Sequence, residues 1–285
     1  MIIDGKKISE EILNELLEER KKYEKIKVVG FMFEENKEGE SFLKTKENFA
    51  KRLNIDFRIY KIEKDWSRKK IRKYINQIVK SKLVNGAFIQ LPILKKFPTQ
   101  YFLNSIPPEK DIDCLSSKNL GKFYSDSFII RPPAVEVVDY IKNRFNLNFS
   151  DKKILIVGYG RLTGKPLAHY FSNESNFLTI ISKRLEDHKN ILKDYDVIVS
   201  GVGKKYLVDD CKNGAILIDF GYSFENGKIY GDIDFEKLKD KAEIITPTPG
   251  GTGPILVSMI FRNLFKLLAA DKRGCNTDLR GYNAD

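Results

Sequence analysis

Segments with the apolar period of a helix alternate with short β-branched runs along nearly the whole chain, and this alternation restricts the fold more than any other feature. Parallel strands need a crossover of a dozen or more residues, usually a helix, so the alternation predicts an α/β fold with parallel sheets. The strands predicted in the first half are residues 27–33, 57–61 and 86–90. The helices predicted around them are residues 6–22, 41–53 and 67–80.

A second α/β unit begins near residue 153, after a stretch at 91–131 that we expect to be rich in loops and a linking helix at 133–147. A final apolar helix is predicted at 255–270, and the polar tail 271–285 resembles a disordered end. The chain has 285 residues, which suits two modest domains, each with a core of its own. The strands predicted in the second unit are residues 153–157, 178–181, 197–201, 215–219 and 243–245.

The stretch ITPTPGGTGP, residues 245–254, precedes the final helix and is dense in proline and glycine. Its prolines fix φ and remove backbone donors, whereas its glycines allow positive φ and the close approach of a ligand to the main chain. Pro254 stands where a helix would have its first residue, a position that proline favours. The stretch is either a ligand-binding loop or a tight connection, and its place after a run of strands and helices favours the loop.

Three glycines, Gly158, Gly160 and Gly164, separate the predicted strand at 153–157 from the helix that follows it. A glycine turn at such a place lets phosphate oxygens reach the N–H groups of a helix N-terminus, so it indicates a dinucleotide site. The spacing G-x-G-x-x-x-G is not the common G-x-G-x-x-G, and a turn needed only for packing is the alternative.

Ser182, Lys183 and Arg184 directly follow the next predicted strand. An acidic residue there would bind the ribose 2′-hydroxyl of NAD, whereas basic side chains suit the 2′-phosphate of NADP. We therefore predict NADP as the cofactor, with NAD possible, and a solvated basic turn as the alternative interpretation.

Composition restricts the class of protein further. The three cysteines form no CxxC pair and no even framework, which is typical of a reducing cytoplasm. We find neither a signal segment nor a continuous apolar stretch of about 18 residues, so we expect a soluble cytoplasmic protein with no membrane partner. The net charge is +11, but the lysines and arginines are interspersed with acidic residues along the chain. This pattern favours anionic small ligands over nucleic acid.

Three separated segments together resemble the bifunctional methylenetetrahydrofolate dehydrogenase/cyclohydrolase family over about residues 3–270. GAFIQLP is similar to the family's strand ending in Gln-Leu-Pro, and IPPEKDIDCLSSKNLGKF to its Pro-x-Lys-Asp-Val-Asp-Gly segment with a following Asn-x-Gly. ITPTPGGTGP resembles the Thr-Pro-Val-Pro-Gly-Gly-Val-Gly-Pro signature. All three occur in the family's order around a dinucleotide turn.

The resemblance implies a three-layer α/β folate domain at 1–147, completed by helix 254–270, and a Rossmann-like doubly wound NAD(P) domain at 148–253. It also implies a homodimer with a substrate cleft between the two domains. Hydride would pass from the methylene carbon of methylenetetrahydrofolate to the nicotinamide, and water would then attack the methenyl product to give 10-formyltetrahydrofolate. The cofactor carries the redox chemistry, so the protein orients the rings and handles protons.

The family's catalytic Tyr-x-x-x-Lys falls on Phe42 and Lys46, so the resemblance makes Lys46 the proton-handling lysine and leaves the tyrosine absent. Phe42 would stack on the folate ring, since helical spacing of four puts both side chains on one face. Gln90 would hydrogen-bond and orient Lys46, and Asp113 would bind the amino edge of the pterin. Alone, these residues would be a surface lysine, a strand end and a turn cap.

The same resemblance gives the remaining contacts. The predicted substrate contacts are Pro92, Pro249, Gly250, Gly251 and Pro254. The predicted cofactor contacts are Gly158, Tyr159, Gly160, Arg161, Leu162, Gly164, Ser182, Lys183, Arg184, Gly203 and Gly221.

Several positions depart from the family pattern. Cys114 replaces the glycine after Asp113, Tyr159 replaces the arginine of Gly-Arg-Ser, and Ile255-Leu256 replaces a more polar pair. Because a hydroxyl is lost at Phe42, we expect dehydrogenase activity to exceed cyclohydrolase activity. Two alternatives stay open: a shikimate or amino-acid dehydrogenase with the same two-domain plan, and a non-catalytic folate- or nucleotide-binding protein.

Overall fold

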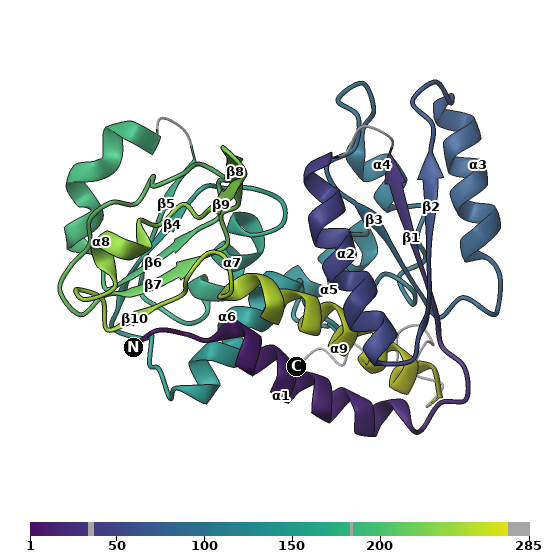
Figure 1. Cartoon of the computed structure of the whole chain (residues 1–285), viewed down its shortest axis with the longest axis horizontal. Coiled ribbons are helices and arrows are strands. Elements are labelled where there is room, and N and C mark those ends of the chain that lie inside the picture. Colours follow the sequence, from purple (N-terminus) through teal and green to yellow (C-terminus); the bar gives the residue numbers. More distant parts are fainter. Residues whose placement is uncertain (34–36, 183–184, 273–285) are drawn as a thin grey trace, which may run out of the picture. The chain divides into compact units, whose positions relative to one another are not determined.

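A computed structural model describes residues 1–33, 37–182 and 185–272 (Figure 1). The chain divides into two compact units, each formed from two stretches of sequence. Unit 1 comprises Met1–Leu13 and Pro132–Met259, and unit 2 comprises Asn14–Arg131 and the chain from Ile260 onward. Helices α1 (Gly5–Arg20) and α9 (Thr252–Lys272) contribute residues to both units.

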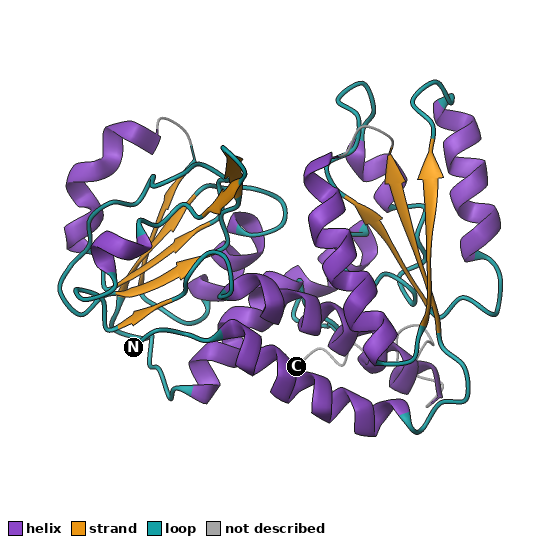
Figure 2. Ribbon diagram, viewed as in Figure 1, coloured by secondary structure: helices purple, strands orange, loops and turns teal. Residues whose placement is uncertain are grey.

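Unit 2 contains a parallel three-stranded sheet in the order β2-β1-β3 (Figure 2). Its strands are β1 (Lys27–Phe33), β2 (Asp56–Ile62) and β3 (Gly86–Gln90), so the three strands predicted from the first half are confirmed. The helices α2 (Lys37–Arg52) and α3 (Arg68–Val79) follow the first two strands. Each predicted helix is therefore present, although α2 begins four residues earlier than expected.

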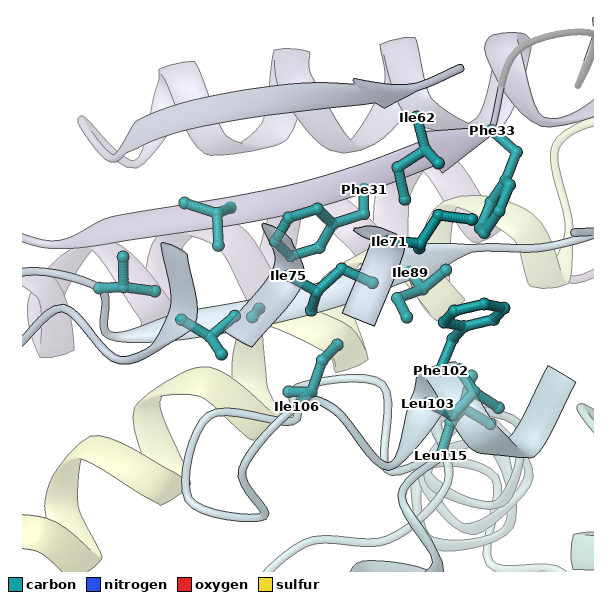
Figure 3. Close-up of a cluster of buried hydrophobic side chains, with 14 residues drawn as sticks. Phe31, Phe33, Ile62, Ile71, Ile75, Ile89, Phe102, Leu103, Ile106 and Leu115 are labelled. Atoms are coloured by element: carbon teal, nitrogen blue, oxygen red, sulfur yellow. The ribbon is translucent and has the colours of Figure 1, made fainter. Parts of the chain in front are cut away.

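The two faces of this sheet can be assigned from the alternation of side chains along its strands. Phe31, Phe33 and Ile89 pack in one cluster with Ile71 and Ile75 of α3 (Figure 3). Phe88 and Gly30 point to the opposite face, where the amine of Lys46 in α2 lies over the Phe88 ring. Helices cover both faces, so the predicted three-layer architecture is confirmed.

The C-terminal half of α9 completes unit 2. Phe261 stacks on Phe49 of α2 with ring centroids 5.2 Å apart, and Leu264 lies against Gly86, where a Cβ would come within 2.8 Å of its Cδ1. The prediction that the last helix packs on the first domain is therefore confirmed. By length and composition α9 could span a membrane, but 61% of its apolar window is buried, as in the core helix of a globular protein.

The stretch at 91–131 consists mostly of loops, as predicted, but it also contains two short helices that were not predicted. These are α4 (Thr99–Leu103) and α5 (Ser117–Tyr124), of five and eight residues. Helices this short show too little apolar periodicity to be recognised. The signal that was missed is the N-cap of α5, where the Ser116 side chain accepts a hydrogen bond from the Asn119 N–H.

Unit 1 contains a five-stranded parallel sheet in the order β10-β7-β6-β4-β5. Counting outward from β4, one half of the sheet holds β5 and the other holds β6, β7 and β10, so the predicted doubly wound topology is confirmed. A hairpin of β8 (Ser223–Glu225) and β9 (Lys228–Tyr230) was not predicted. The strands of the sheet are β4 (Lys153–Val157), β5 (Phe177–Ile181), β6 (Val197–Ser200), β7 (Ile216–Asp219) and β10 (Ile244–Ile245).

Helices α6 (Pro133–Arg144), α7 (Gly164–Ser172) and α8 (Phe235–Leu238), with the 3₁₀ helix η1 (Leu185–Asp194), complete unit 1. The Tyr170 hydroxyl in α7 donates to Asp139 in α6 at 3.1 Å, which ties α6 to unit 1. The predicted domain boundaries, with this helix in the first domain, stay a prediction.

Candidate active site

A buried ion pair joins α2 to the segment that follows β3 in the chain. The Lys46 Nζ donates to the Asp113 Oδ2 at 3.2 Å, and the two side chains are only 3% and 12% exposed. These residues are 67 positions apart in the sequence, and both belong to unit 2. A buried ion pair stabilises a fold only weakly because both charges lose their water, so its presence suggests a functional role.

Two phenylalanine rings enclose the amine of Lys46. The Nζ lies 4.1 Å from the Phe88 ring centroid and 5.2 Å from that of Phe42, one turn away on the same helix. Burial lowers the pKa of Lys46 from its ordinary value, and the charge of Asp113 opposes this shift without cancelling it. The amine is thus easier to deprotonate than a surface lysine.

Gln90 lies on the same side of the sheet as Phe88, because the two residues are two apart in β3. Its Nε2 donates to the Leu91 carbonyl oxygen at 3.0 Å, and the Leu91–Pro92 peptide bond is cis. The structure therefore places Lys46, Phe42, Gln90 and Asp113 around one face of the sheet. In the structure the Lys46 amine donates to Asp113, whereas the sequence led us to expect a hydrogen bond between Lys46 and Gln90.

Two buried polar residues near Asp113 were not foreseen from the sequence. Asp111 accepts hydrogen bonds from the N–H groups of Leu115 and Ser116, at 3.1 and 2.7 Å, and so orders the turn around Asp113. Burial raises the pKa of Asp111 to about 6. Asn263 of α9 donates through Nδ2 to the carbonyl oxygens of Ile112 and Arg131, at 3.1 and 2.9 Å.

Asp113 keeps acceptor capacity beyond its ion pair. Within the described part of the chain its Oδ1 is buried and has no hydrogen-bond partner, and the same holds for the Oδ1 of Asn263. A buried unsatisfied oxygen costs about 1–3 kcal/mol, which a bound donor group would recover.

The departure at Cys114 can be explained by the backbone. Cys114 is fully buried and has a φ of 55°, a left-handed conformation that glycine adopts without strain. A glycine, which the family pattern has here, would therefore suit this position.

The turn between β4 and α7 has the geometry of a phosphate site. Gly158 has a φ of 94°, and a Cβ on Gly164 would come within 2.0 Å of the Gly158 carbonyl oxygen, so both positions require glycine. Beside Gly160 there is open space, and Tyr159 and Leu162 are 46% and 50% exposed. An exposed turn thus precedes a helix N-terminus, which fits the pyrophosphate of a dinucleotide.

Other predicted cofactor residues lie at the same edge of the sheet. Gly203, with a φ of 82°, and Gly221 follow the carboxyl ends of β6 and β7, which run parallel to β4. Ser182 is exposed directly after β5. Lys183 and Arg184 lie outside the described residues, so the predicted 2′-phosphate contact is not tested.

The segment 245–254 is a constrained turn in unit 1. Its Thr248–Pro249 bond is cis, Gly250 has a φ of 104°, and the Gly251 N–H donates to the Pro247 carbonyl at 2.8 Å. The prediction that Pro254 is the first helical residue is wrong, because α9 begins two residues earlier, at Thr252. Proline is tolerated there, since the N–H groups of the first turn have no intrahelical acceptor.

A separate basic hollow of about 470 Å³ lies over α3, on the opposite layer from Lys46. It belongs to a different surface of unit 2 from the Lys46 site, and its side chains are those of a solvated helix face. It is lined by Lys69, Arg72, Lys73, Asn76, Gln77, Lys80 and Tyr101.

Known proteins match both halves of the chain. The family model of the tetrahydrofolate dehydrogenase/cyclohydrolase catalytic domain matches residues 3–113, and that of the NAD(P)-binding domain of the same enzymes matches residues 132–272. The bifunctional protein FolD of Clostridium tetani is 35% identical over 269 residues, 92% of this chain and 97% of that protein.

Solved structures agree with these matches. The methylenetetrahydrofolate dehydrogenase-cyclohydrolase of Trypanosoma brucei, complexed with NADP and an inhibitor, has a TM-score of 0.86 at 25% identity, covering 97% of this chain and 99% of that one. The bifunctional enzyme of Campylobacter jejuni gives a TM-score of 0.85 at 25% identity, covering 96% and 99%.

Proposed function

Because the chain belongs to the tetrahydrofolate dehydrogenase/cyclohydrolase family, we propose that it oxidises 5,10-methylenetetrahydrofolate with NADP and hydrolyses the methenyl product to 10-formyltetrahydrofolate. The observation that supports this most directly is the buried Lys46 amine, held by Asp113 between aromatic rings. Burial lowers the pKa of this amine, so it gives up its proton more readily than a surface lysine, as the hydrolysis requires.

The turn of residues 158–164 would hold the dinucleotide phosphates, with Gly203 and Gly221 at the neighbouring strand ends. When bound, NADP supplies the hydride acceptor of the oxidation. The residues of this chain would hold the reacting carbon next to the cofactor. Ser182, Lys183 and Arg184 are our candidates for the 2′-phosphate.

In the hydrolysis, Lys46 takes a proton from water as the water oxygen bonds to the methenyl carbon. The hydroxyl of this adduct then loses its remaining proton to solvent as the carbon–oxygen double bond forms. The bond from that carbon to N5 breaks in the same step, and Lys46 returns its proton to N5, so that the formyl group remains on N10. Asp113 receives the amino edge of the pterin through its unpaired Oδ1, and Gln90 orients the site from the same face of the sheet. The half-buried Phe42 ring stacks on the folate.

Phe42 carries no hydroxyl to share the proton transfer. We therefore propose that dehydrogenase turnover exceeds cyclohydrolase turnover in this enzyme. The substrate contacts Pro92, Pro249, Gly250, Gly251 and Pro254 stay predictions.

We further propose that the protein works in the cytoplasm as a homodimer, without nucleic-acid or membrane partners, and that its domains divide near residues 147 and 254. The shikimate and amino-acid dehydrogenase alternatives are not favoured, because both halves match tetrahydrofolate dehydrogenase/cyclohydrolase models. The buried ion pair between Lys46 and Asp113 argues against a non-catalytic role.

An absorbance assay tests the proposal. Purified protein is mixed with methylenetetrahydrofolate and either NADP or NAD, and formation and decay of the methenyl product are followed. Oxidation that is faster with NADP, followed by slower decay, supports the proposal, and absence of oxidation with both cofactors contradicts it. Lys46→Met should abolish the decay, whereas Lys44→Met, an exposed lysine of the same helix, should not affect it.

A further inference from the structure

Asp232 is a fully buried carboxylate whose two oxygens are saturated by donors. Its Oδ2 accepts from the Ser200 hydroxyl at 2.6 Å and from the Val202 N–H at 2.7 Å. Its Oδ1 accepts from the N–H groups of Gly203 and Lys204, at 2.9 and 2.7 Å. Three consecutive N–H groups thus curve around one carboxylate, in the manner of a backbone anion nest.

The turn that Asp232 holds lies beside the glycine turn of the dinucleotide site. β4 and β6 are parallel neighbours with Val157 opposite Ser200, so the two turns leave the same edge of the sheet. A Cβ on Gly158 would come within 2.8 Å of the Val202 side chain, and one on Gly201 within 2.8 Å of Thr163. The turn at 201–204 is therefore packed directly against the turn at 158–163.

A second carboxylate fixes Asp232 in its place. Asp219, at the end of β7, accepts from the N–H groups of Gly221, Asp232 and Ile233, at 2.7, 3.3 and 3.0 Å. A Cβ on Gly221 would lie 2.1 Å from the Asp232 Cγ, so the carboxylate fills the space that any larger residue would need. Burial, and to a lesser degree the charge of Asp232, raises the pKa of Asp219 to about 7, which eases the repulsion between the two groups.

We propose that Asp232 is a positioning residue for the nicotinamide cofactor, acting through the backbone of residues 202–204 on the neighbouring dinucleotide turn. It does not touch the reacting atoms. The inference rests on the proposed function, because it concerns the NADP site of that reaction.

Replacing Asp232 by Asn tests the inference. The amide would turn an NH₂ group toward N–H donors, so the turn would open while the side chain kept its volume. We expect the KM for NADP to rise ten-fold or more while the KM for methylenetetrahydrofolate stays within two-fold. Hydrolysis of methenyltetrahydrofolate, which needs no NADP, should also stay within two-fold of the unmodified enzyme.

Asp234→Asn is the matched control, because Asp234 is the next carboxylate in the chain and only caps α8, accepting from the Lys237 N–H at 3.4 Å. It should leave the KM for NADP unchanged. If Asp232→Asn does not fold, Ser200→Ala removes one of the four donors and should raise the KM for NADP about three-fold, again without affecting hydrolysis.

An unchanged KM for NADP, or an equal loss of oxidation and hydrolysis in the folded variant, would overturn the inference. Failure of the proposed function is distinguishable, since the unmodified enzyme would then not oxidise methylenetetrahydrofolate at all.

Discussion

At the scale of single residues, burial gives Lys46 a chemistry that its sequence neighbours do not have. It lies on a lysine-rich helix, yet it is buried and faces Asp113 and two aromatic rings. Sequence spacing alone predicts a surface charge at this position, and only the resemblance to a family assigned it a role. The pairing with Asp113 could not be predicted from spacing, because it depends on the turn that Asp111 and Asn263 order.

Lys46→Arg separates charge from proton transfer. Arginine preserves the positive charge opposite Asp113 but does not release its proton in proteins, so we expect hydrolysis to fall by about 10²–10⁴. Circular dichroism should show a folded protein, and single-turnover decay of methenyltetrahydrofolate measures the effect. Hydrolysis at the unmodified rate would exclude Lys46 from proton transfer.

Phe42→Tyr restores the hydroxyl that the family pattern has. We expect cyclohydrolase turnover to rise about ten-fold or more, since a positioned acid–base group contributes at least that much. Dehydrogenase turnover should stay within two-fold, and Phe128→Tyr, at an exposed phenylalanine of the same unit, is the control. A ratio of the two activities that does not change would show that the missing hydroxyl does not limit hydrolysis.

At the scale of elements, long periodic segments were predicted well and short ones were not. Strand β4 is a continuous apolar run and helix α3 has a clear apolar period. Helix α5 and the β8–β9 hairpin are too short to show either signal and depend on local caps and turns. The Gly158 turn was found because glycine is required there by backbone geometry. Asp232 was missed because buried carboxylates look like surface charges in a sequence.

The turn between β4 and α7 gives a matched pair of substitutions. In Gly164→Ala the new methyl group would meet the Gly158 carbonyl oxygen at 2.0 Å, so we expect a loss of about 1–3 kcal/mol in the free energy of unfolding. Gly160→Ala meets open space and should change stability by less than about 0.5 kcal/mol. Urea denaturation measures both values, and equal stabilities would contradict the close approach of Gly164 to the Gly158 carbonyl.

Asp219 should make stability depend on pH. Its pKa is raised from 3.8 to about 7 in the folded protein, so the folded state binds more protons than the unfolded state between these values. The stability that Asp219 contributes is therefore fully present below about pH 4 and is lost as the pH rises to about 7. Over this range the free energy of unfolding falls by up to about 1.4 kcal/mol per pH unit. Asp111, with a pKa of about 6, acts in the same direction.

Urea denaturation at pH 5 and pH 7.5 tests this dependence. Asp219→Asn removes the ionisation, so its free energy of unfolding should fall less between the two pH values than that of the unmodified protein. The quantity compared is the change in the free energy of unfolding between the two pH values, because the variant also loses hydrogen bonds that lower its stability at both. Identical differences in the two proteins would refute the assignment to Asp219.

At the scale of the whole molecule, alternating strands and helices predicted both parallel sheets, and the family resemblance predicted how α9 completes the first domain. The division of the chain could not be read from composition, because α1 and α9 each contribute residues to both units. The basic net charge of +11 suits a protein whose proposed ligands, NADP and a folate, are both anions.

The most direct test of the central claim is a crystal structure with NADP and a methenyltetrahydrofolate analogue bound. We predict that the Lys46 Nζ lies within about 3.5 Å of the reacting carbon, or one water molecule away from it, and that Asp113 contacts the amino edge of the pterin. A pterin bound away from Lys46, with the Lys46–Asp113 pair closed to it, would contradict the account.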